Sequence, residues 1–533
     1  MERQTSARRI AGLFLLMFGL AGAASVAAER PALADAAERG DKAVIRSLLD
    51  ARADVNAPQV DGMTALHWAV YHDDLETAGL LVRSGAIVNA VNRYGVPPLS
   101  LACTNGNAAL VLLLLGAGAD ANASLPGGET VLMTAARTGN LDTVGALLAK
   151  GANPNAKERN EQTALMWAAA EGHAAVVDAL LKAGADANLQ ARVSELKDRK
   201  NADYPSGGFT AVMWAVRNGH EEIVRQLVAA GANLGARNGD GATPMMIAIV
   251  NDRFDLAAKL VGLGADVDDG SLYHAVEMRD ATTDWYAHDG SKLRNDFANE
   301  RTALDLIALL LDKGADPNKA FVGQMHSASM CCDTFANASP FFRAAVAADV
   351  EALKLLVARD AKLEWTPTNA ENSGPGANAH VGKTAILVAI NGGKGVPLSA
   401  GPGYSRVGPP PFREQSNRAP ADAVRVLAAA GANVNAVGPD GATALHKAVE
   451  LRNLDTLRAL TEGGASLKAK NGDGLTALDI ALKLKPDDPN ASPFGPASNK
   501  DGASPEEVVA LLRDAATSPA VETHAAASTR EAR

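Results

Sequence analysis

The stretch TALMWAAAEGH (Thr163–His173) returns almost unchanged as TAVMWAVRNGH (Thr210–His220). Near-identity of this length marks an internal repeat, so the distance between copies measures the repeat. With the threonine of each phrase as an anchor, related phrases recur every 33 residues at six places, for example from residue 64 to 97, 130 and then 163. The two quoted copies lie 47 residues apart, so fourteen extra residues separate them. The chain is therefore an array of short units, some of them lengthened.

Each unit contains signals for two helices and a turn. The anchor Thr64 is a hydroxyl residue placed to cap the helix that follows, and Pro98 stands one position after its anchor, where a first-turn proline loses no hydrogen bond. Gly139, nine residues after its anchor, closes that helix. The second helix follows, as in AAVVDALLKAGA (Ala174–Ala185), and then a polar segment whose tip is often Asp-Gly, as at Asp61–Gly62. Aromatic residues make up only 4% of the chain, so alanine, leucine and valine must form the core.

These phrases resemble the ankyrin repeat, a unit of 33 residues with the signature T-P-L-H-x-A. TALHWA (Thr64–Ala69) and TALHKA (Thr443–Ala448) match the signature best. TALMWA and TAVMWA carry Met for His, which weakens the usual contact between the Thr and His side chains. The resemblance extends over residues 29 to 516 and twelve units. It implies an all-α ankyrin-repeat solenoid of about 12 helix-turn-helix repeats, with finger loops, several inserted loops and a concave face that binds another protein.

The extra residues fall in two kinds of loop. In the unit that begins at Thr163 the distance to the end of the second helix is normal, so all fourteen lie in the finger loop, within residues 192–206. Two further fingers are lengthened, between residues 314 and 339 and between 360 and 384, and one is almost deleted, between 264 and 270. Three insertions instead lengthen the turn between the two helices of a unit, within residues 270–314, 384–431 and 476–514.

The insertions define the expected organisation of the chain. Residues 1–28 have the form of a signal peptide, 29–269 hold regular repeats 1–7, and 270–442 hold repeats 8–10 with long insertions. Residues 443–516 hold repeats 11–12 with the C-terminal cap, and 517–533 form a tail that we expect to be disordered. The inserted stretches carry six aromatic residues, which fit recognition of a partner, packing against the array or neutral drift. They are Tyr204, Trp285, Tyr286, Phe321, Trp365 and Tyr404.

The N-terminal residues predict export. Three arginines precede the apolar run Ile10–Ala23, and small residues suit cleavage near Ala28. We therefore expect a monomeric periplasmic or secreted protein of bacterial type, with no stable membrane insertion after cleavage. The alternative is that the apolar run is retained as an anchor. The net charge of −10 argues against nucleic acid as a partner.

No stretch of the sequence predicts catalysis. GANAHVGKTA (Gly376–Ala385) has the look of a phosphate-binding loop, but Ala377 stands where its first glycine is required, and neither G-x-S-x-G nor H-E-x-x-H occurs. MHSASMCCD (Met325–Asp333) gathers soft ligands without a C-x-x-C pair. Cys103 lies on the small-residue face of a first helix and should belong to the core. We expect no enzyme activity, no cofactor and no bound metal.

Two sets of repeated residues are interpreted as scaffold. His173 and His220 occupy the same position at the start of second helices, and Trp68, Trp167 and Trp214 all stand four residues after their anchors. Repetition of this kind favours packing between repeats over a stripe of rings that stacks a ligand.

The resemblance to ankyrin repeats also selects candidate contact residues, at positions −4, −3, −1, +7 and +8 from the anchors. With aromatic residues of the inserted loops they form the expected protein-binding set: Asp61, Tyr71, His72, Arg93, Tyr94, Glu129, Arg137, Arg159, Asn160, Glu171, Tyr204, Phe209, Arg217 and Trp365. Their mixture of charges, rings and amides suits a protein surface. We expect a non-enzymatic protein–protein interaction scaffold that uses the concave face and the lengthened fingers. The alternatives are a secreted effector or inhibitor acting on a foreign protein, and a metal- or redox-handling protein with a site in the inserted loop at 321–338.

Overall fold

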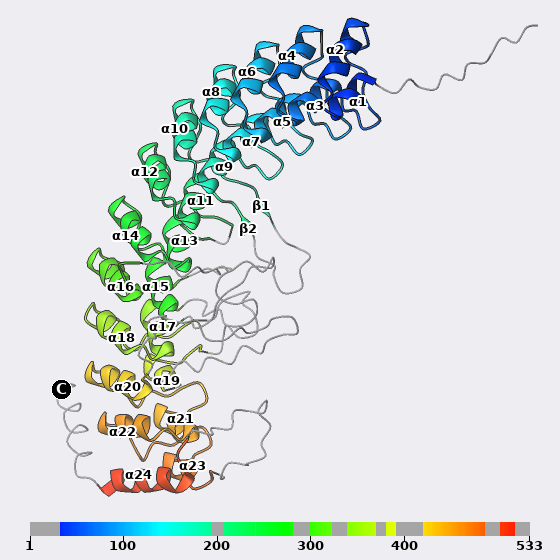
Figure 1. The fold of residues 1–533 in the computed structure, drawn as a ribbon. Helices are drawn as coiled ribbons and strands as arrows, with labels where there is room; N and C mark the ends of the chain where they lie inside the picture. Colours follow the sequence, from blue (N-terminus) through cyan, green and yellow to red (C-terminus); the bar gives the residue numbers. More distant parts are fainter. Residues whose placement is uncertain are drawn as a thin grey trace, which may run out of the picture. The chain divides into compact units, whose positions relative to one another are not determined.

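The computed structural model describes residues 32–194, 206–239, 241–280, 299–321, 338–368, 380–390, 419–484 and 502–517. Within these ranges the chain forms 24 helices, which follow one another as twelve contacting pairs (Figure 1). The predicted all-α array of about twelve helix-turn-helix repeats is thereby confirmed. We call the odd-numbered helix of each pair the first helix and the even-numbered one the second helix.

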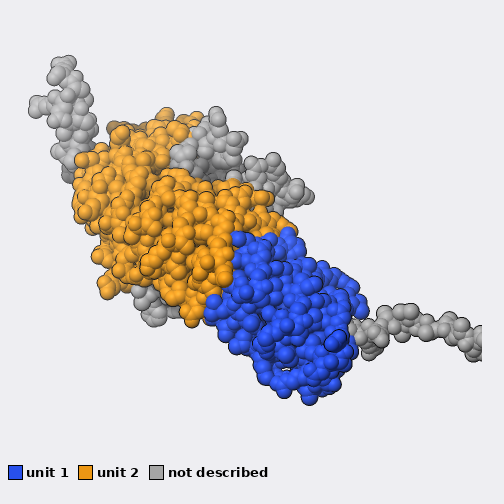
Figure 2. All heavy atoms as spheres, turned by 90° about the horizontal axis from the view of Figure 1, so that it is seen from above, with its two compact units in different colours: residues 1–126 blue, residues 127–533 orange. Residues whose placement is uncertain are grey.

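The chain divides into two compact units, Met1–Pro126 and Gly127–Arg533 (Figure 2). The helices of unit 1 are α1 (Ala32–Glu38), α2 (Lys42–Asp50), α3 (Ala65–Tyr71), α4 (Leu75–Arg83), α5 (Pro98–Asn105) and α6 (Ala108–Gly116). The first part of unit 2 holds α7 (Val131–Thr138), α8 (Leu141–Ala149), α9 (Ala164–Glu171), α10 (Ala174–Lys182), β1 (Val193–Ser194), β2 (Ser206–Gly207), α11 (Ala211–Asn218), α12 (Glu221–Ala229), α13 (Pro244–Val250) and α14 (Phe254–Gly262). The remainder of unit 2 holds α15 (Ser271–Asp280), α16 (Ala303–Asp312), α17 (Pro340–Ala347), α18 (Val350–Val357), α19 (Ala385–Ala389), α20 (Pro420–Ala429), α21 (Ala444–Leu451), α22 (Leu454–Glu462), α23 (Ala477–Ala481) and α24 (Pro505–Thr517).

Capping residues begin and end the first helices where the sequence predicts. The hydroxyl oxygen of Thr64 accepts the backbone N–H of His67, and His67 Nδ1 accepts the backbone N–H of Thr64 at 3.2 Å, which forms a reciprocal capping box. In repeat 5 the backbone N–H of Met166 still donates to the Thr163 hydroxyl, at 3.4 Å, without the returning bond. The reciprocal bond is thus absent in the two repeats with TALMWA and TAVMWA, whereas in repeat 4 the Met133 sulfur still accepts the backbone N–H of Thr130. Gly139 ends α7 in the left-handed region, with a φ of 76°.

Small residues form the contacts between first helices. Within each unit, first helices pack against first helices and second helices against second helices, as the two rows of ribbons show (Figure 1). Ala102 in α5 and Ala168 in α9 are completely buried, and the lack of a longer side chain lets neighbouring helices approach closely. The second helices contribute larger apolar groups such as Leu114 and Leu180, also completely buried. Burying one such leucine stabilises the fold by roughly 1.5–3 kcal/mol.

An asparagine in each of several polar turns ties one repeat to the next. In unit 2, the Asn155 side chain donates to the carbonyl of Gly184 at 2.9 Å and accepts the backbone N–H of Asp186 at 2.8 Å. Asn188 makes the same two contacts across the lengthened finger, to Gly231 and Asn233. The insertion in that finger therefore leaves the stacking of its two flanking repeats intact.

The inserted stretches lie in the loops that the sequence predicts. After α10, β1 pairs antiparallel with β2 at the base of the lengthened finger, with Val193 opposite Gly207. Residues 195–205 of this finger lie outside the described ranges. The insertions predicted between the two helices of one repeat separate α15 from α16, α19 from α20 and α23 from α24.

Two of the six aromatic residues in the inserted stretches are described, and both pack against the array. Phe321 stacks on Tyr273 of α15, with ring centroids 5.3 Å apart. Trp365 packs against Phe342 of α17 at 5.5 Å. Packing therefore accounts for these two rings, while residues 204, 285, 286 and 404 lie outside the described ranges.

Candidate functional site

Main-chain hydrogen bonds between neighbouring fingers fix the backbone of several candidate residues. In unit 1 the backbone N–H of Arg93 donates to the carbonyl of Asp61 in the preceding finger, at 2.8 Å. In unit 2 the backbone N–H of Arg159 donates to the carbonyl of Gly127 at 2.9 Å. The side chains of Arg93, Arg159 and Asn160 remain exposed. We call the exposed residues of the first helices and fingers of each unit its first-helix face.

Aromatic residues gather at the end of α3 in unit 1. Trp68 meets Tyr71 edge to face with ring centroids 5.5 Å apart, and stacks on His72 at 5.9 Å. His72 Nε2 forms a hydrogen bond with the carbonyl of Glu38 at 2.8 Å, so this ring also joins two repeats. Tyr71 is 56% exposed, and Tyr94 in the next finger is 68% exposed. The structure therefore brings the candidates Tyr71 and His72 together and leaves Tyr94 exposed in its finger.

Two tryptophans on the first helices of unit 2 each have an arginine side chain over the ring. The guanidinium carbon of Arg137 lies 5.1 Å from the ring centroid of Trp167, and that of Arg217 lies 5.6 Å from the ring of Trp214. Both distances are in the range of cation–π interactions. Phe209 packs against Trp214 with centroids 4.8 Å apart. The candidates Arg137, Phe209 and Arg217 thus meet two rings that the sequence assigns to packing.

Few carboxylates balance these arginines. Glu129 accepts the hydroxyl of Thr134 at 2.9 Å and lies 3.8 Å from the guanidinium of Arg137. Glu171 is exposed at the end of α9 and makes no ion pair with a described residue. The side chain of Arg217 likewise has no carboxylate partner among the described residues. No carboxylate of the described residues therefore forms an ion pair with the guanidinium beside Trp214.

The indole N–H groups of the three repeated tryptophans differ in their partners. Trp68 Nε1 donates to the side-chain oxygen of Gln59 at 2.6 Å. The Nε1 atoms of Trp167 and Trp214 are buried, and no acceptor from a described residue lies within hydrogen-bond distance of them. In repeat 5 the residue equivalent to Gln59 is Glu158, whose carboxylate accepts the backbone N–H of its own finger. A buried donor without an acceptor costs roughly 1–3 kcal/mol, so these two rings occupy their position at a cost to stability.

The remaining candidates do not join these clusters. Trp365 is half-buried against Phe342 in a later finger. Tyr204 lies outside the described residues. The set of candidates is therefore distributed over both units rather than gathered in one cleft.

Histidines at the start of second helices tie repeats together. His173 Nε2 forms a hydrogen bond with the carbonyl of Arg137 at 3.0 Å, and His220 Nε2 forms one with the carbonyl of Ala170 at 3.1 Å. Gly172 has a φ of 85°, and a Cβ there would lie 2.7 Å from the His220 ring. These contacts agree with the interpretation of both histidines as scaffold.

A buried ion pair joins repeats 8 and 9 and is not predicted by the sequence analysis. Arg279 of α15 donates to both carboxylate oxygens of Asp349, at 2.5 and 3.1 Å, and to Glu351 at 2.8 Å. The Arg279 and Asp349 side chains are 2% and 1% exposed. Arg279 stands nine residues after Gly270, the anchor of its repeat, where Gly139 of repeat 4 ends its first helix. Glycine is also missing at this position in repeats 2, 7, 9 and 11, so its absence does not predict the buried pair.

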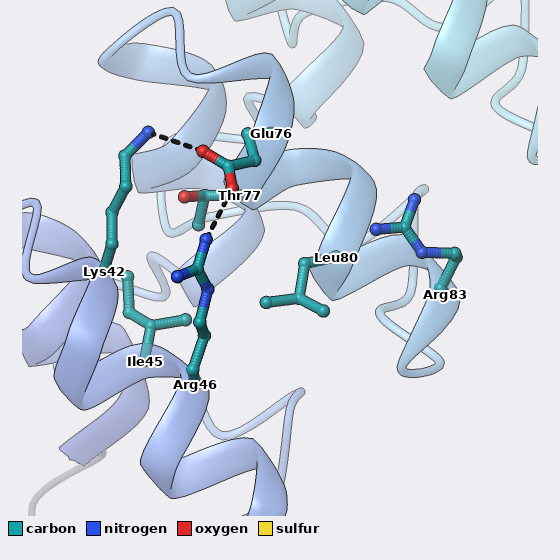
Figure 3. Close-up of a pocket in the computed structure, with 7 residues that line it drawn as sticks. All are labelled: Lys42, Ile45, Arg46, Glu76, Thr77, Leu80 and Arg83. Atoms are coloured by element: carbon teal, nitrogen blue, oxygen red, sulfur yellow. Dashed lines mark hydrogen bonds and ion pairs between the residues drawn. The ribbon is translucent and has the colours of Figure 1, made fainter.

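Two hollows on the described surface are lined by residues that form ion pairs or hydrogen bonds within the chain. The first has a volume of about 160 Å³ in unit 1 and is lined by Lys42, Ile45, Arg46, Glu76, Thr77, Leu80 and Arg83 (Figure 3). Its Glu76 carboxylate pairs with Lys42 at 3.3 Å and Arg46 at 2.5 Å. The second, of about 310 Å³ in unit 2, lies beside the shortened finger, where Lys319 donates to the carbonyl of Asp268 at 2.6 Å. In both hollows these charged groups pair with other residues of the chain.

The residues considered for chemistry show no catalytic or metal arrangement in the described ranges. Cys103 is completely buried, which confirms its place in the core, and burial raises its pKa to about 12. Residues 325–333, the stretch with soft ligands, lie outside the described ranges. Among the described residues, no group of three His, Cys, Asp or Glu side chains could hold a metal ion. No described helix has the length and apolar character needed to cross a bilayer.

Models of one repeat family match most of the array. The model described as ankyrin repeats in three copies matches residues 16–92, 33–124, 99–191 and 193–270, and the model of ankyrin repeats in many copies matches residues 427–481. The crystal structure of the human ASB11 ankyrin repeat domain is similar at 27% sequence identity, covering 40% of this chain and 90% of that chain with a TM-score of 0.35. No curated protein matches the sequence. The matched models span more than half of the chain and agree with the twelve helix pairs of the described residues, and the chain therefore belongs to the ankyrin-repeat family.

Proposed function

We propose that this protein is a non-enzymatic interaction scaffold whose first-helix faces bind another protein. The observation that carries the proposal is the exposure of rings and guanidinium groups on a scaffold built from alanine and leucine. Tyr71 and Tyr94 are more than half exposed, and Arg137 and Arg217 lie over half-buried tryptophan rings. Aromatic and arginine side chains are enriched at the centres of protein interfaces. Ankyrin repeats generally serve as protein-binding modules, which supports the same conclusion.

The lengthened fingers and the cellular location belong to the same proposal. The finger that contains β1 and β2 joins α10 to the first helix α11, and we propose that it enlarges the contact. Export rests on the basic, apolar and small-residue order of the N-terminal sequence. N-terminal sequencing of the protein from fractionated cells tests it: a mature chain that begins after Ala28 supports export, and an intact Met1 in the cytoplasm contradicts it.

Photo-crosslinking tests whether a partner contacts the first-helix face. A photoreactive phenylalanine analogue replaces Tyr71 on α3 or Glu171 on α9, and a matched control replaces Leu112, which is 57% exposed on the second helix α6. We expect one partner to crosslink from the first-helix positions and not from Leu112, because second helices lie outside the proposed contact. Equal crosslinking from all three positions, or from none, contradicts the proposal.

The origin of the crosslinked partner separates two forms of this function. A partner from the producing cell fits a scaffold that acts in its own envelope. A partner found only in extracts of other cells fits a secreted effector or inhibitor instead, with the same face in use. Loss of the crosslink on deletion of residues 192–205 assigns part of the contact to the lengthened finger.

A further inference from the structure

Two carboxylates on the first helix of repeat 1 share one neutral hydrogen-bond donor. The side-chain nitrogen of Gln59 donates to Asp35 Oδ1 at 2.8 Å and to Glu38 Oε2 at 2.7 Å. Because both oxygens bond to the same nitrogen, they lie at most 5.5 Å apart, the sum of the two distances. Neither carboxylate forms an ion pair with a described residue, and an amide carries no net charge. The two negative charges are therefore close together and not neutralised by the described residues.

An exposed tyrosine adjoins this pair on the neighbouring helix. Tyr71 on α3 and Glu38 on α1 both stand seven residues after their anchors, and these two first helices pack directly against each other. Tyr71 is 56% exposed, and its ring meets that of Trp68 edge to face. The Trp68 indole donates to Gln59, the residue that also bonds to both carboxylates. One connected surface thus holds three accessible groups, which we call the acidic–aromatic patch: Asp35, Glu38 and Tyr71.

The equivalent place in unit 2 holds a cation instead of a carboxylate. Seven residues after the anchor of repeat 4 stands Arg137, whose guanidinium lies over the ring of Trp167 in repeat 5 and 3.8 Å from the Glu129 carboxylate. In repeat 1 the same position is Glu38, and among the described residues no arginine or lysine lies over a ring of repeat 2. Repeats 4 and 5 therefore combine ring, carboxylate and cation within the chain, whereas repeats 1 and 2 offer rings and carboxylates only.

We propose that the acidic–aromatic patch binds an arginine side chain of the partner protein, held between the carboxylates of Asp35 and Glu38 and beside the ring of Tyr71. The inference rests on the proposed protein-binding function and names the chemistry of the partner at this face. A cation placed between two close carboxylates removes their mutual repulsion. Arginine suits the patch better than lysine, because its planar guanidinium bonds to two carboxylates at once and stacks on an aromatic ring. Arg39, exposed at the end of α1, repels such a group and thereby limits its affinity.

Saturation-transfer difference NMR, which detects weak binding to a large protein, tests the proposed class with defined peptides. The probe is an acetylated and amidated pentapeptide of serine and alanine with a central arginine, and its controls carry citrulline, lysine or glutamate at that position. Citrulline has the shape of arginine without its charge. We expect the arginine peptide to bind the full mature chain about tenfold more tightly than the citrulline peptide, with affinity falling as salt rises. Equal binding of the arginine and citrulline peptides, or preference for glutamate, overturns the proposal.

Matched variants assign the binding to the patch. Glu38→Gln should weaken binding of the arginine peptide about fivefold and Tyr71→Leu about threefold, whereas Arg39→Gln should strengthen it, because a repelling charge is removed. Glu38→Arg copies the cation of repeat 4 and should abolish binding. The control is Asp50→Asn, which removes an exposed carboxylate at the end of the second helix α2 in the same repeat and should leave binding unchanged. Circular dichroism checks that each variant is folded, and equal losses in the control and test variants overturn the proposal.

Two other occupants of the patch give different results. Calcium that displaces the arginine peptide at micromolar concentration and constant ionic strength assigns the carboxylate pair to a metal ion. Sedimentation that shows dimers of the mature chain, and their loss in Glu38→Gln, assigns the patch to a second copy. Either result overturns the proposal.

The two levels of the proposal fail differently. A partner that crosslinks at residue 71 or 171 while the arginine and citrulline peptides bind equally leaves the scaffold function in place and overturns the arginine-bearing class. A partner whose crosslink at residue 71 is competed by the arginine peptide and not by the citrulline peptide supports both levels. Absence of both crosslink and peptide binding contradicts both levels.

Discussion

Replacing a tryptophan by phenylalanine should destabilise repeat 2 and spare repeat 6. Trp68 and Trp214 both stand four residues after the anchor of their repeat and are half-buried on a first helix. Trp68 donates its indole N–H to Gln59 at 2.6 Å, whereas the N–H of Trp214 has no acceptor. Phenylalanine keeps an aromatic ring and removes the N–H. The two substitutions therefore share the loss of ring surface and differ in the hydrogen bond.

The expected size of the difference follows from the energies of these groups. Trp68→Phe loses a hydrogen bond that contributes about 1 kcal/mol, in addition to roughly 1 kcal/mol of lost apolar contact. Trp214→Phe loses a similar area and part of its contact with Arg217, but it also removes a buried donor that destabilises the fold by about 1–3 kcal/mol. We therefore expect about 2 kcal/mol of destabilisation in repeat 2 and a change close to zero, or a small stabilisation, in repeat 6.

Hydrogen exchange of the full chain measures the two repeats separately. In an array, neighbouring repeats open locally, so a single unfolding midpoint would average the effect over many repeats. Exchange followed by peptide mass spectrometry reads α3 (Ala65–Tyr71) and α11 (Ala211–Asn218) directly. Each 1.4 kcal/mol changes an opening equilibrium about tenfold, so Trp68→Phe should cut protection in α3 at least tenfold while Trp214→Phe leaves α11 protected. An equal loss of protection in both helices would refute the reasoning, since the indole donors would then be energetically equivalent.

Three further predictions concern groups in the core. Burial lowers the pKa of His67 below its ordinary 6.5, although its hydrogen bond with the Val96 carbonyl acts in the opposite direction. By NMR the ring should titrate below pH 6.5. The stabilisation by neutral His67 should be complete above pH 6.5 and decrease as the pH falls towards the pKa of the folded state. His67→Met should remove this pH dependence from the hydrogen exchange of α3. Arg279→Met should destabilise the contact between repeats 8 and 9 by about 3–5 kcal/mol, because it leaves the Asp349 carboxylate buried and unpaired, and exchange in α15 and α18 should show the loss. Cys103, buried with a pKa raised to about 12, should resist iodoacetamide at pH 8 in the native protein and react after denaturation, as peptide mass spectrometry will detect.

Local signals explain why the repeat framework follows so closely from the sequence. A threonine cap, a first-turn proline and a glycine in the left-handed region each act within one helix, and each needs only its immediate neighbours. Pro98 indeed begins α5, and Gly219 ends α11 with a φ of 78°. Interruptions of the 33-residue spacing also locate the insertions. The repeats on either side of the lengthened finger still stack, because the Asn188 side chain bonds to Gly231 and Asn233 across it.

Contacts between residues far apart in the chain are the part of the structure that the sequence analysis does not predict. Arg279 and Asp349 are seventy positions apart, and no local pattern specifies that two charges will be buried together. The hydrogen-bond partners of the repeated tryptophans cannot be predicted from the sequence either. Gln59 accepts the indole N–H of Trp68, whereas the equivalent Glu158 accepts a backbone N–H of its own finger. Repetition of a residue type identifies the structural position and not the contacts that each copy makes.

The indole N–H groups differ within one repeated position: that of Trp68 has an acceptor, and those of Trp167 and Trp214 have none among the described residues. A phenylalanine or leucine would fill the position without leaving a buried N–H group unpaired. An array tolerates that penalty because its stability is distributed over many contacts between repeats, so a local cost of about 1–3 kcal/mol does not unfold its neighbours. Trp68, with its acceptor in place, is fully accounted for as structure. The Nε1 atoms of Trp167 and Trp214 are buried without an acceptor among the described residues, so these two rings hold their position at a cost that the stacking of repeats 5 and 6 offsets.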